Sequence, residues 1–534
     1  MDMFMEKLLL LGDEAIAQGA IDAGMSGVYA YPGTPSTEIT EYVQQSELAL
    51  SRGIHHQWSS NEKTALESAL GMSYAGKRAM ACMKHVGLNV AADVFMNAAI
   101  TGVNGGLVIT VADDPSMHSS QNEQDSRYFG KFAMVPVFEP SNQQEAYEMI
   151  FEAFQLSENH QLPILMRITT RLAHSRSIVT RHQVLEQNPM KIPKDPSQFV
   201  LLPAIARKRF KVLLDHQPAI SHLAAQSEYN QYYDGADKSL GIIACGLGYN
   251  YFMESSKNKV AYPHLKIGQY PAPVNLIREL INNVEKVLVI EDGYPFLEEQ
   301  INGLLGNEKV MGRLDGTFPR DGEMTPDLVK AAMNIKDDGP SLEVPEILVP
   351  RPPALCKGCS HIDMYESLNK ALERFSKGRV FSDIGCYTLG ALEPYKSINS
   401  CVDMGASITM AKGAADAGLL PSVAVIGDST FTHSGMTGLL DAVNEKTPIT
   451  IIISDNSTTG MTGGQDSPGT GKIENICKGI GVEAEHLIVM SPLKKFREEN
   501  AGIILRELNY EGVSVIISQR ECIQSVSRKK RSTV

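Results

Sequence analysis

Two acidic segments follow apolar runs at a spacing that suits a divalent-cation site. Gly427-Asp428-Ser429 ends the run 422–427, and Asp455-Asn456 follows the run 449–454. The 26 residues between Ser429 and Asn456 are enough for a crossover helix and a return strand. Both segments would then lie at the carboxyl ends of parallel strands, where open α/β sheets bind ligands. The Asp428 carboxylate, the Asn456 amide oxygen and the Thr458 carbonyl can bind Mg²⁺ there, although a helix-capping aspartate is the structural alternative.

A second segment that could do chemistry is Cys356-Lys357-Gly358-Cys359-Ser360-His361. A Cys-x-x-Cys pair can be half of a zinc or iron–sulfur site, with His361 as a further ligand. A closed structural site needs four ligands, and no second pair with ligand spacing occurs in the sequence. Only Cys477 and Cys522 follow Cys401, and two cysteines cannot ligate a four-iron cluster. We therefore expect no metal at this segment and no iron–sulfur cluster in the chain.

Parallel strands must position these segments, and the sequence indicates where they lie. Short apolar runs without strict alternation, each followed by polar or turn residues, suit strands that are buried on both faces. They occur at residues 28–31, 106–111, 163–168, 239–244, 287–291, 380–383, 422–427, 449–454 and 513–518. Helical patterns alternate with them, so we expect an α/β fold of serial domains with mostly parallel sheets. The apolar start at 8–11 is interpreted as part of a first helix.

Proline-containing stretches predict the domain boundaries. Residues 187–237 interrupt the rhythm of strands and are interpreted as a connection that carries a helix from 203 to 227. Five prolines between 340 and 353 suit an extended linker. We predict a first domain at residues 1–190 and a connecting segment at 191–237. A second domain would follow at 238–345 and a third at 346–534.

Composition and charge exclude several classes of function. The 534 residues are 43% hydrophobic and 21% charged, as in globular proteins. A net charge of −13 argues against nucleic acid as the main partner, and the basic tail 528–531 is interpreted as a frayed, solvated terminus. No apolar run approaches the ~20 residues that span a bilayer, so we expect no membrane partner. Eight scattered cysteines do not form a disulfide framework, which predicts a cytoplasmic protein.

Several segments, in the same order along the chain, resemble the thiamine-diphosphate-dependent 2-oxoacid:ferredoxin oxidoreductases, and most closely the indolepyruvate:ferredoxin branch. They are residues 31–38, 61–63, 83–89, 113–125, 356–361, 383–390, 404–408 and 454–465. The resemblance covers nearly the whole chain. It is least specific over 238–345, which is similar to a transketolase-type C-terminal domain. One departure is Ser429, which stands where the family's motif usually has glycine.

The resemblance implies roles for individual residues. The first domain would bind the aminopyrimidine ring, and Glu62 would be the catalytic carboxyl group that hydrogen-bonds it, although a helix N-terminal glutamate is the structural alternative. Thr34 and Arg127 would contact the substrate carboxylate, unless Arg127 forms an ordinary surface ion pair. The third domain would bind the diphosphate and thiazolium through Gly358, Cys359, His361, Gly385, Cys386, Met404, Gly405, Gly427, Asp428, Ser429, Asn456, Thr458, Gly460 and Met461. Asp428, Asn456 and Thr458 would also hold the Mg²⁺.

The function that the resemblance implies is oxidative decarboxylation of an aryl 2-oxoacid of the indolepyruvate type to the acyl-coenzyme A. The expected partners are the 2-oxoacid, coenzyme A, a second copy in a homodimer, a smaller beta subunit and ferredoxin or another electron acceptor. The family's large subunit ends in a ferredoxin-like domain with two cysteine runs, which this sequence lacks, as a natural short form or as a truncation. A non-oxidative 2-oxoacid decarboxylase and a cofactor-binding subunit that is inactive alone are the alternatives.

Overall fold

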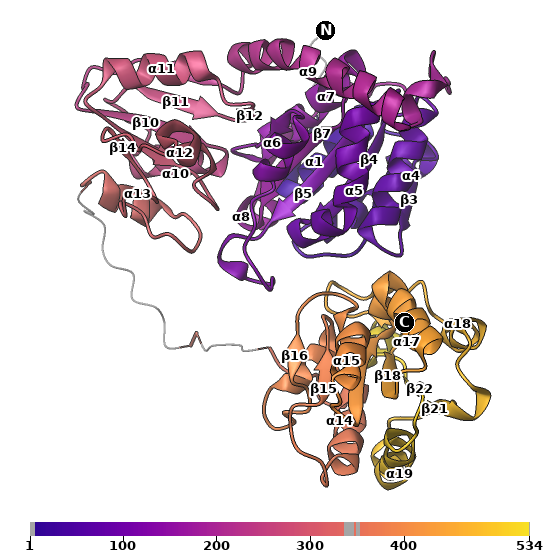
Figure 1. Ribbon diagram of the computed structural model, residues 1–534. Coiled ribbons are helices and arrows are strands. Elements are labelled where there is room, and N and C mark those ends of the chain that lie inside the picture. The colour runs from indigo at the N-terminus through magenta and orange to yellow at the C-terminus, as the bar shows by residue number, and fades with distance from the viewer. Residues whose placement is uncertain (1–5, 336–346, 349–352, 533–534) are drawn as a thin grey trace. The chain divides into compact units, whose positions relative to one another are not determined.

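The computed structural model describes residues 6–335, 347–348 and 353–532, which divide into two compact units, 1–341 and 342–534 (Figure 1). Most of the predicted linker 340–353, and the predicted domain boundary at 345/346, lie outside the described residues. None of the described helices combines the length and the apolar character needed to cross a bilayer.

The largest sheet of the first unit has seven strands in the order β12-β6-β7-β5-β4-β2-β3. All neighbouring strands are parallel except the edge strand β12, which is antiparallel to β6. The strands are β2 (Gly27–Ala30), β3 (His55–Trp58), β4 (Ala79–Lys84), β5 (Leu107–Asp113), β6 (Val137–Phe138), β7 (Ile164–Thr169) and β12 (Gln269–Tyr270). Because residues 269–270 belong to the predicted second domain, this edge strand ties the two domains of the unit together.

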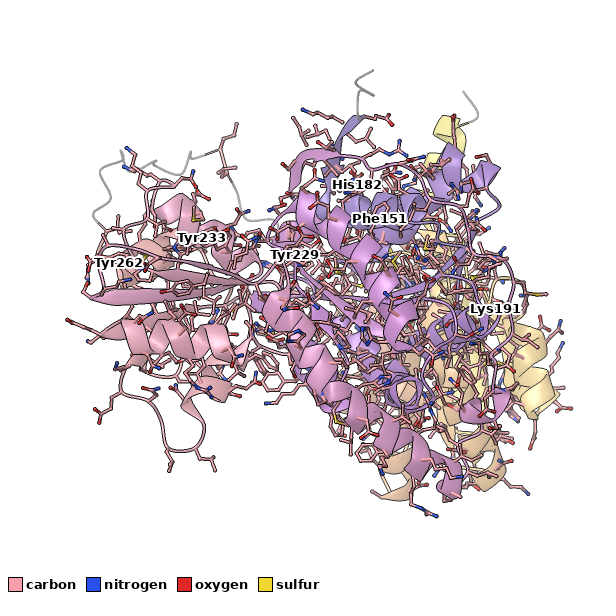
Figure 2. All side chains as sticks on the ribbon, turned by 90° about the horizontal axis from the view of Figure 1, so that it is seen from above. Phe151, His182, Lys191, Tyr229, Tyr233 and Tyr262 are labelled. Atoms are coloured by element: carbon pink, nitrogen blue, oxygen red, sulfur yellow. The ribbon has the colours of Figure 1, made fainter. Side chains whose placement is uncertain are left out.

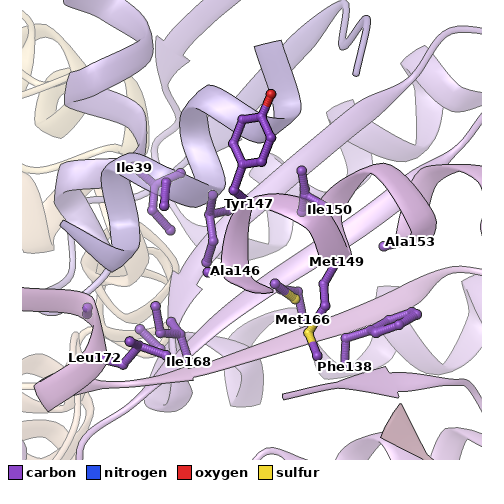
Figure 3. Close-up of a cluster of buried hydrophobic side chains, with 14 of the residues drawn as sticks. Ile39, Phe138, Ala146, Tyr147, Met149, Ile150, Ala153, Met166, Ile168 and Leu172 are labelled. Carbon is purple, nitrogen blue, oxygen red and sulfur yellow. The ribbon is translucent and has the colours of Figure 1, made fainter. Parts of the chain in front are cut away.

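Helices cover both faces of this sheet, which explains why its strands are apolar throughout. In β4, Met80 and Cys82 pack on one face with helices α1 (Gly12–Asp22) and α7 (Gln143–His160). The alternate residues of the strand pack on the other face with α4 (Glu62–Tyr74) and α5 (His85–Thr101). Figure 3 shows part of the first layer, where buried side chains of α7 meet Met166 and Ile168 of β7. Successive strand side chains point to opposite faces, so a doubly covered sheet needs an apolar residue at each position.

A second sheet completes the first unit, with strands in the order β14-β13-β10-β11-β9. The long helix α9 (Pro203–Gln226) precedes it, followed by Tyr229, which Figure 2 labels. The Tyr229 ring packs edge-on against Phe138 of the first sheet. The strands are β9 (Gln231–Tyr233), β10 (Leu240–Cys245), β11 (His264–Ile267), β13 (Lys286–Ile290) and β14 (Val310–Met311); the helices between and after them are α10 (Leu247–Ser255), α11 (Val274–Asn283), α12 (Phe296–Asn302) and α13 (Pro326–Ala332).

The second unit contains a six-stranded, fully parallel sheet in the order β16-β15-β17-β18-β22-β21. Its central strands carry unbroken apolar runs, because helices pack on both faces. The strands are β15 (Val380–Ser382), β16 (Ser400–Cys401), β17 (Ser422–Gly427), β18 (Ile449–Asp455), β21 (Leu487–Met490) and β22 (Ser514–Gln519); the longer helices are α14 (Ser360–Ala371), α15 (Ala406–Asp416), α17 (Met436–Glu445), α18 (Ile473–Ile480), α19 (Arg497–Leu508) and α20 (Ile523–Ser532).

The expected α/β class with mostly parallel sheets is confirmed, and each strand expected in the described residues is present within about two residues of its predicted bounds. The interpretation of residues 8–11 as helix is wrong. They form β1 (Lys7–Leu11), which pairs with β8 (Arg176–Thr180), and α1 begins only at Gly12. The pairing partner lies more than 160 residues away along the chain, so no local pattern announced the strand.

Candidate functional site

In the second unit, Asp428 and Asn456 follow neighbouring strands, as their spacing predicts. Gly427 at the end of β17 is in register with Ser454 of β18, so both segments reach the same edge of the sheet. Asp428 is 2% exposed, and its Oδ2 has no hydrogen-bond partner among the described residues. Burial, followed by the charge of Asp455, raises the pKa of Asp428 to about 7. A bound cation would supply the partner that this buried carboxylate lacks.

The loop after β18 is held by its own polar side chains. The Asn456 Oδ1 accepts a hydrogen bond from the Thr458 backbone N–H at 3.2 Å, and the Thr458 hydroxyl donates to the Gln465 carbonyl at 2.9 Å. Ser429, which replaces the usual glycine, accepts a hydrogen bond from the Thr459 hydroxyl at 3.0 Å. Its hydroxyl therefore connects the two strand-end loops, and the departure from the family motif fits the fold.

At two of the predicted cofactor-binding glycines, a side chain would collide with a neighbouring aromatic ring. A Cβ atom on Gly385 would lie 2.3 Å from the Tyr387 ring, and one on Gly427 would lie 2.6 Å from it. The Tyr387 hydroxyl donates to the buried Asp383 carboxylate, which also accepts from the Ser407 hydroxyl at 2.6 Å. Burial raises the pKa of Asp383 to about 6. This packing fixes the loop after β15 beside the end of β17.

The other predicted cofactor residues of this unit differ in exposure. Gly405 immediately precedes α15 and has a φ of 96°, and a Cβ atom there would lie 2.6 Å from Ser434, so only glycine fits. Met404 is half-buried, whereas Gly358 and Met461 are exposed. Because Gly358 and Met461 are exposed, the second unit by itself does not support their predicted contacts with the cofactor.

Four cysteines surround one cavity of about 220 Å³ in the second unit. Cys356 and Cys359 precede α14, Cys386 follows β15, and Cys522 lies immediately before α20. Burial, followed by the neighbouring thiols of Cys359, Cys522 and Cys356, raises the pKa of Cys386 to about 12. Two thiols from elsewhere in the chain, those of Cys386 and Cys522, therefore line the same cavity as the Cys-x-x-Cys pair. The signal that could have found the set was the count of cysteines across the whole third domain rather than in adjacent pairs.

Three further predicted residues, together with the start of α20, also line this cavity: His361, Asn456 and Gly460. Gly460 lies beside the Cys386 thiol, and the buried His361 ring contacts the Cys359 Sγ through Nδ1 at 3.0 Å. Burial lowers the pKa of His361 to about 4, so its imidazole is neutral at physiological pH. Arg528 of α20 donates a hydrogen bond to the Gly463 carbonyl. The basic tail is therefore not simply a frayed end, because its first arginine is held against the loop after β18.

In the first unit, Glu62 is the first residue of α4 and is 5% exposed. The preceding Asn61 caps the helix by accepting from the Thr64 backbone N–H at 2.9 Å. The first turn of α5 passes so close that a Cβ atom on Gly87 would lie 2.6 Å from the Glu62 Oε1. The carboxyl group is thus fixed between two helix N-termini, as a positioned acid–base group requires.

Thr34 lies in the turn after β2. Ser119 links it to Lys84, a residue that was not predicted as part of the site. The Ser119 hydroxyl donates to the Thr34 carbonyl at 3.3 Å, and the Lys84 ammonium donates to the Ser119 carbonyl at 2.8 Å. Burial lowers the pKa of Lys84 to about 8, against the opposing effect of Asp114. A lysine at the end of an otherwise apolar strand was the available signal, because such a group is costly to bury.

Arg127 does not take the position that its predicted role requires. Its side chain is fully buried, and its guanidinium is paired with Asp125, with Glu291 at 2.9 Å and with Glu139 at 3.5 Å. These carboxylates occupy the donors that a substrate carboxylate would need. Arg127 therefore stabilises the junction of the two sheets of the first unit, and it is not the surface ion pair of the alternative either.

Comparison with known families defines the class of the protein. Residues 383–488 match the model described as thiamine pyrophosphate enzyme, C-terminal TPP binding domain. Residues 18–239 match the model described as pyruvate flavodoxin/ferredoxin oxidoreductase, thiamine diP-bdg. A solved 2-oxoglutarate:ferredoxin oxidoreductase from Magnetococcus marinus, with 2-oxoglutarate, coenzyme A and succinyl-CoA bound, has the same fold, with a TM-score of 0.51 and 17% identity over 62% of this chain and 65% of that chain. The protein is a thiamine-diphosphate-dependent 2-oxoacid oxidoreductase.

Curated relatives identify the family within this class. The indolepyruvate oxidoreductase subunit IorA of Archaeoglobus fulgidus is 40% identical over 98% of this chain and 88% of its own length. That of Methanothermobacter thermautotrophicus is 39% identical, over 97% of this chain and 87% of its own length. The 2-oxoglutarate synthase subunit KorA of Methanothermobacter marburgensis is 27% identical over 36% of this chain. The chain belongs to the family of the indolepyruvate oxidoreductase IorA subunits.

Proposed function

We propose that this chain oxidatively decarboxylates an aryl 2-oxoacid of the indolepyruvate type, forms the acyl-coenzyme A and passes two electrons to ferredoxin or a similar acceptor. The proposal rests above all on full-length similarity to subunits that are named indolepyruvate oxidoreductases. Thiamine diphosphate, when bound, supplies the nucleophilic carbon and the electron sink for the reaction. The protein's residues supply the binding site, the proton handling and the electron exit.

The strand-end residues of the second unit fit a Mg²⁺-bound diphosphate. The orphaned Oδ2 of Asp428 supports it as the principal ligand, with the Asn456 side-chain oxygen and the Thr458 carbonyl as neutral oxygen ligands. Gly405 and Gly427 leave room at the loops where a side chain would collide with the protein itself. These residues would orient the cofactor.

Glu62 is proposed to hold the proton that the aminopyrimidine ring exchanges. A buried carboxyl group at the start of α4 can donate a proton to a ring nitrogen and take it back without moving. The Thr34 hydroxyl is proposed to hydrogen-bond the substrate carboxylate. Arg127 is not assigned this role, because its partners are already carboxylates.

The four thiols around the cavity are proposed to bind one [4Fe–4S] cluster, which needs four cysteine ligands. Thiolates on a single zinc ion lie roughly 4 Å apart, since Zn–S bonds are about 2.3 Å. Among the described residues, no three cysteines have sulfur atoms within 4.8 Å of one another. The cavity therefore suits a group larger than a single ion. A cluster there would give electrons a route out of the cofactor loops, and it replaces the expectation that the chain carries no iron–sulfur cluster.

The remaining partners follow from the family. The subunit designation of the relatives supports a smaller second subunit, and we propose a homodimer of this chain as the core of the assembly. Coenzyme A is proposed as the acyl acceptor.

Product analysis on indolepyruvate, with and without coenzyme A and a one-electron dye, tests the proposal directly. We expect acyl-coenzyme A only when both are present, and a kcat/KM for indolepyruvate and phenylpyruvate that exceeds that for pyruvate. Aldehyde formation without an acceptor would instead identify a non-oxidative decarboxylase. Complete inactivity that a second subunit restores would identify a subunit that cannot act alone.

A further inference from the structure

Three side chains of ligand type converge in the first unit, away from the residues assigned above. Asp13 lies in the first turn of α1, Glu38 in the first turn of α2 (Thr37–Gln45), and His174 at the end of α8 (Thr170–His174). One carboxylate oxygen of each acid and one ring nitrogen of the histidine all lie within 4.8 Å of one another. Among the described residues, this is the one group of three or more acids, histidines or cysteines that is so close.

The surroundings of Asp13 are unfavourable for a charged carboxylate. Its side chain is fully buried, and neither carboxylate oxygen has a hydrogen-bond partner among the described residues. The charges that act on it come from Glu38 and Glu14, and both are negative. Helix dipoles offset part of the charge of an acid in a first turn, but a buried carboxylate without hydrogen bonds stays costly. A positive ligand between the carboxylates would relieve both the burial and the repulsion.

We propose that Asp13, Glu38 and His174 bind one divalent cation. Two carboxylate oxygens and one imidazole nitrogen form a mixed donor set that suits ions such as Mn²⁺ and Zn²⁺. The Glu38 and His174 side chains are 34% and 36% exposed, and the distance between Glu38 Oε1 and His174 Nε2 is 3.5 Å. Solvent therefore reaches Glu38 and His174, whose side chains can rotate to bind an ion. Asp13 would be the buried ligand on the opposite side of the ion.

The position of the cluster predicts a structural role for the ion. It would connect the start of α1 to the start of α2, which directly follows the turn that carries Thr34. It would also connect both to α8, whose Thr170 hydroxyl donates to the Asp114 carboxylate at 2.7 Å, and Asp114 is paired with Lys84 at 3.7 Å. One ion would thus join three segments around the turn that carries Thr34.

A proton on Asp13 is the competing way to neutralise the cluster. Asp13→Asn separates the two, because the amide keeps the shape of a protonated carboxyl group but is a poor cation ligand. If a proton neutralises Asp13, the variant resembles the parent, and neither of them binds a cation here. If a cation neutralises Asp13, the variant loses cation binding.

The test uses the full chain carrying Asp428→Ala, which removes the expected Mg²⁺ site of the second unit. Mn²⁺ is the probe, because the cysteine cavity favours softer ions. Chelator-treated protein is titrated with Mn²⁺ and followed by electron paramagnetic resonance, with thermal unfolding measured alongside. We expect one bound Mn²⁺ per chain and a rise of the unfolding temperature on binding. Asp13→Asn and His174→Gln are each expected to weaken binding at least ~100-fold, since even groups that only hydrogen-bond a metal's ligands contribute 10–100-fold to affinity.

His182→Gln is the matched control, since His182 is also partly exposed and lies 3.9 Å from a glutamate, Glu148, outside the cluster. This variant should bind Mn²⁺ like its parent. If Asp13→Asn does not fold, His174→Gln carries the test alone, because its site is at the surface. Absence of a bound Mn²⁺ in the Asp428→Ala parent, or unchanged binding in both cluster variants, would overturn the proposal.

Discussion

At the scale of single residues, the proposed site contains two buried carboxyl groups, those of Asp428 and Glu62. Asp428 has an oxygen without a hydrogen-bond partner in the described part of the chain, and Glu62 is buried against the first turn of a second helix. A glycine makes room beside each of these groups. Gly427, next to Asp428, leaves space for the Tyr387 ring, and Gly87 leaves space for the Glu62 side chain. The chemistry of these residues therefore depends on neighbours that take no part in it.

Asp428→Ala is expected to lower the affinity for thiamine diphosphate in the presence of Mg²⁺ by more than about 100-fold, because the diphosphate then has no bridging ion. Isothermal titration of the full chain measures the change. Asp441→Ala, in α17, is a matched control away from the strand ends and should leave the affinity unchanged. Equal affinities for wild type and Asp428→Ala would remove Asp428 from the site.

Glu62→Gln is expected to retain cofactor binding and to lose the reaction by about 10²–10⁴-fold, because an amide cannot exchange the proton that the carboxyl group holds. Exchange of the thiazolium C2 proton of bound cofactor, followed by NMR after an acid quench, reports this step without substrate. Glu67→Gln, on the exposed face of the same helix, is the control. A wild-type exchange rate in Glu62→Gln would exclude the proposed role.

Gly87→Ala tests whether the position of Glu62 matters as well as its identity. Alanine usually stabilises a helix interior relative to glycine by about 1 kcal/mol. Here its Cβ atom would lie 2.6 Å from the Glu62 carboxyl group and displace it. We expect kcat to fall by up to about 100-fold, with a folded protein that still binds the cofactor. Gly71→Ala in α4, where no atom lies within 4 Å of the added Cβ, should keep full activity; the same loss in both variants would point to a general helix effect.

At the scale of elements, the sequence predicts the parallel sheets well because burial on both faces leaves an unmistakable apolar run. The spacing of Asp428 and Asn456 also predicts their meeting, since neighbouring parallel strands end at one edge. Features made by distant pairing are missed. Strand β1 needs its partner at 176–180, and the four-cysteine cavity needs Cys522, which lies 136 residues beyond Cys386. Local patterns carry no information about such partners.

The start of α20 brings Cys522 to the cavity, so this element is expected to decide iron binding. Cys522→Ser should leave the protein folded and lower its content of iron and acid-labile sulfide from about four of each per chain to a small fraction of that. Anaerobic purification followed by iron and sulfide analysis measures the loss. Cys401→Ser, an exposed cysteine outside the cavity, should retain both. Wild-type protein without iron, or an unchanged iron content in Cys522→Ser, would refute the cluster.

At the scale of the whole molecule, the first unit depends on a buried charge network that joins its two sheets. Two arginines are surrounded by carboxylates from both sheets at Asp113, Asp125, Glu139 and Glu291. The Glu291 carboxyl also accepts from the Leu297 and Glu298 backbone N–H groups at 3.0 and 3.1 Å. Four acids against two arginines leave an excess of buried negative charge, which adds to the larger effect of burial on the pKa of Glu291. Arg127 therefore joins carboxylates that belong to both of these sheets.

Stability should depend on pH through this network. Burial, partly offset by Arg127, raises the pKa of Glu291 to about 7, above the ordinary value of 4.5. Between these values the folded chain binds more protons than the unfolded chain, so the contribution of Glu291 to the free energy of unfolding falls as pH rises through this window. Glutamine does not titrate. The stability of Glu291→Gln relative to wild type should therefore rise by about 2 kcal/mol from pH 5 to pH 8.

Urea unfolding at these pH values, followed by the fluorescence of Trp58, measures the change, because Trp58 is the chain's single tryptophan and lies in the first unit. The exposed Glu308→Gln in the same unit should follow the wild-type pH dependence. Parallel profiles for wild type and Glu291→Gln would show that Glu291 stays ionised in the folded protein. Another acid of the network would then hold the proton, and Asp113 is the first to examine, because burial also raises its pKa.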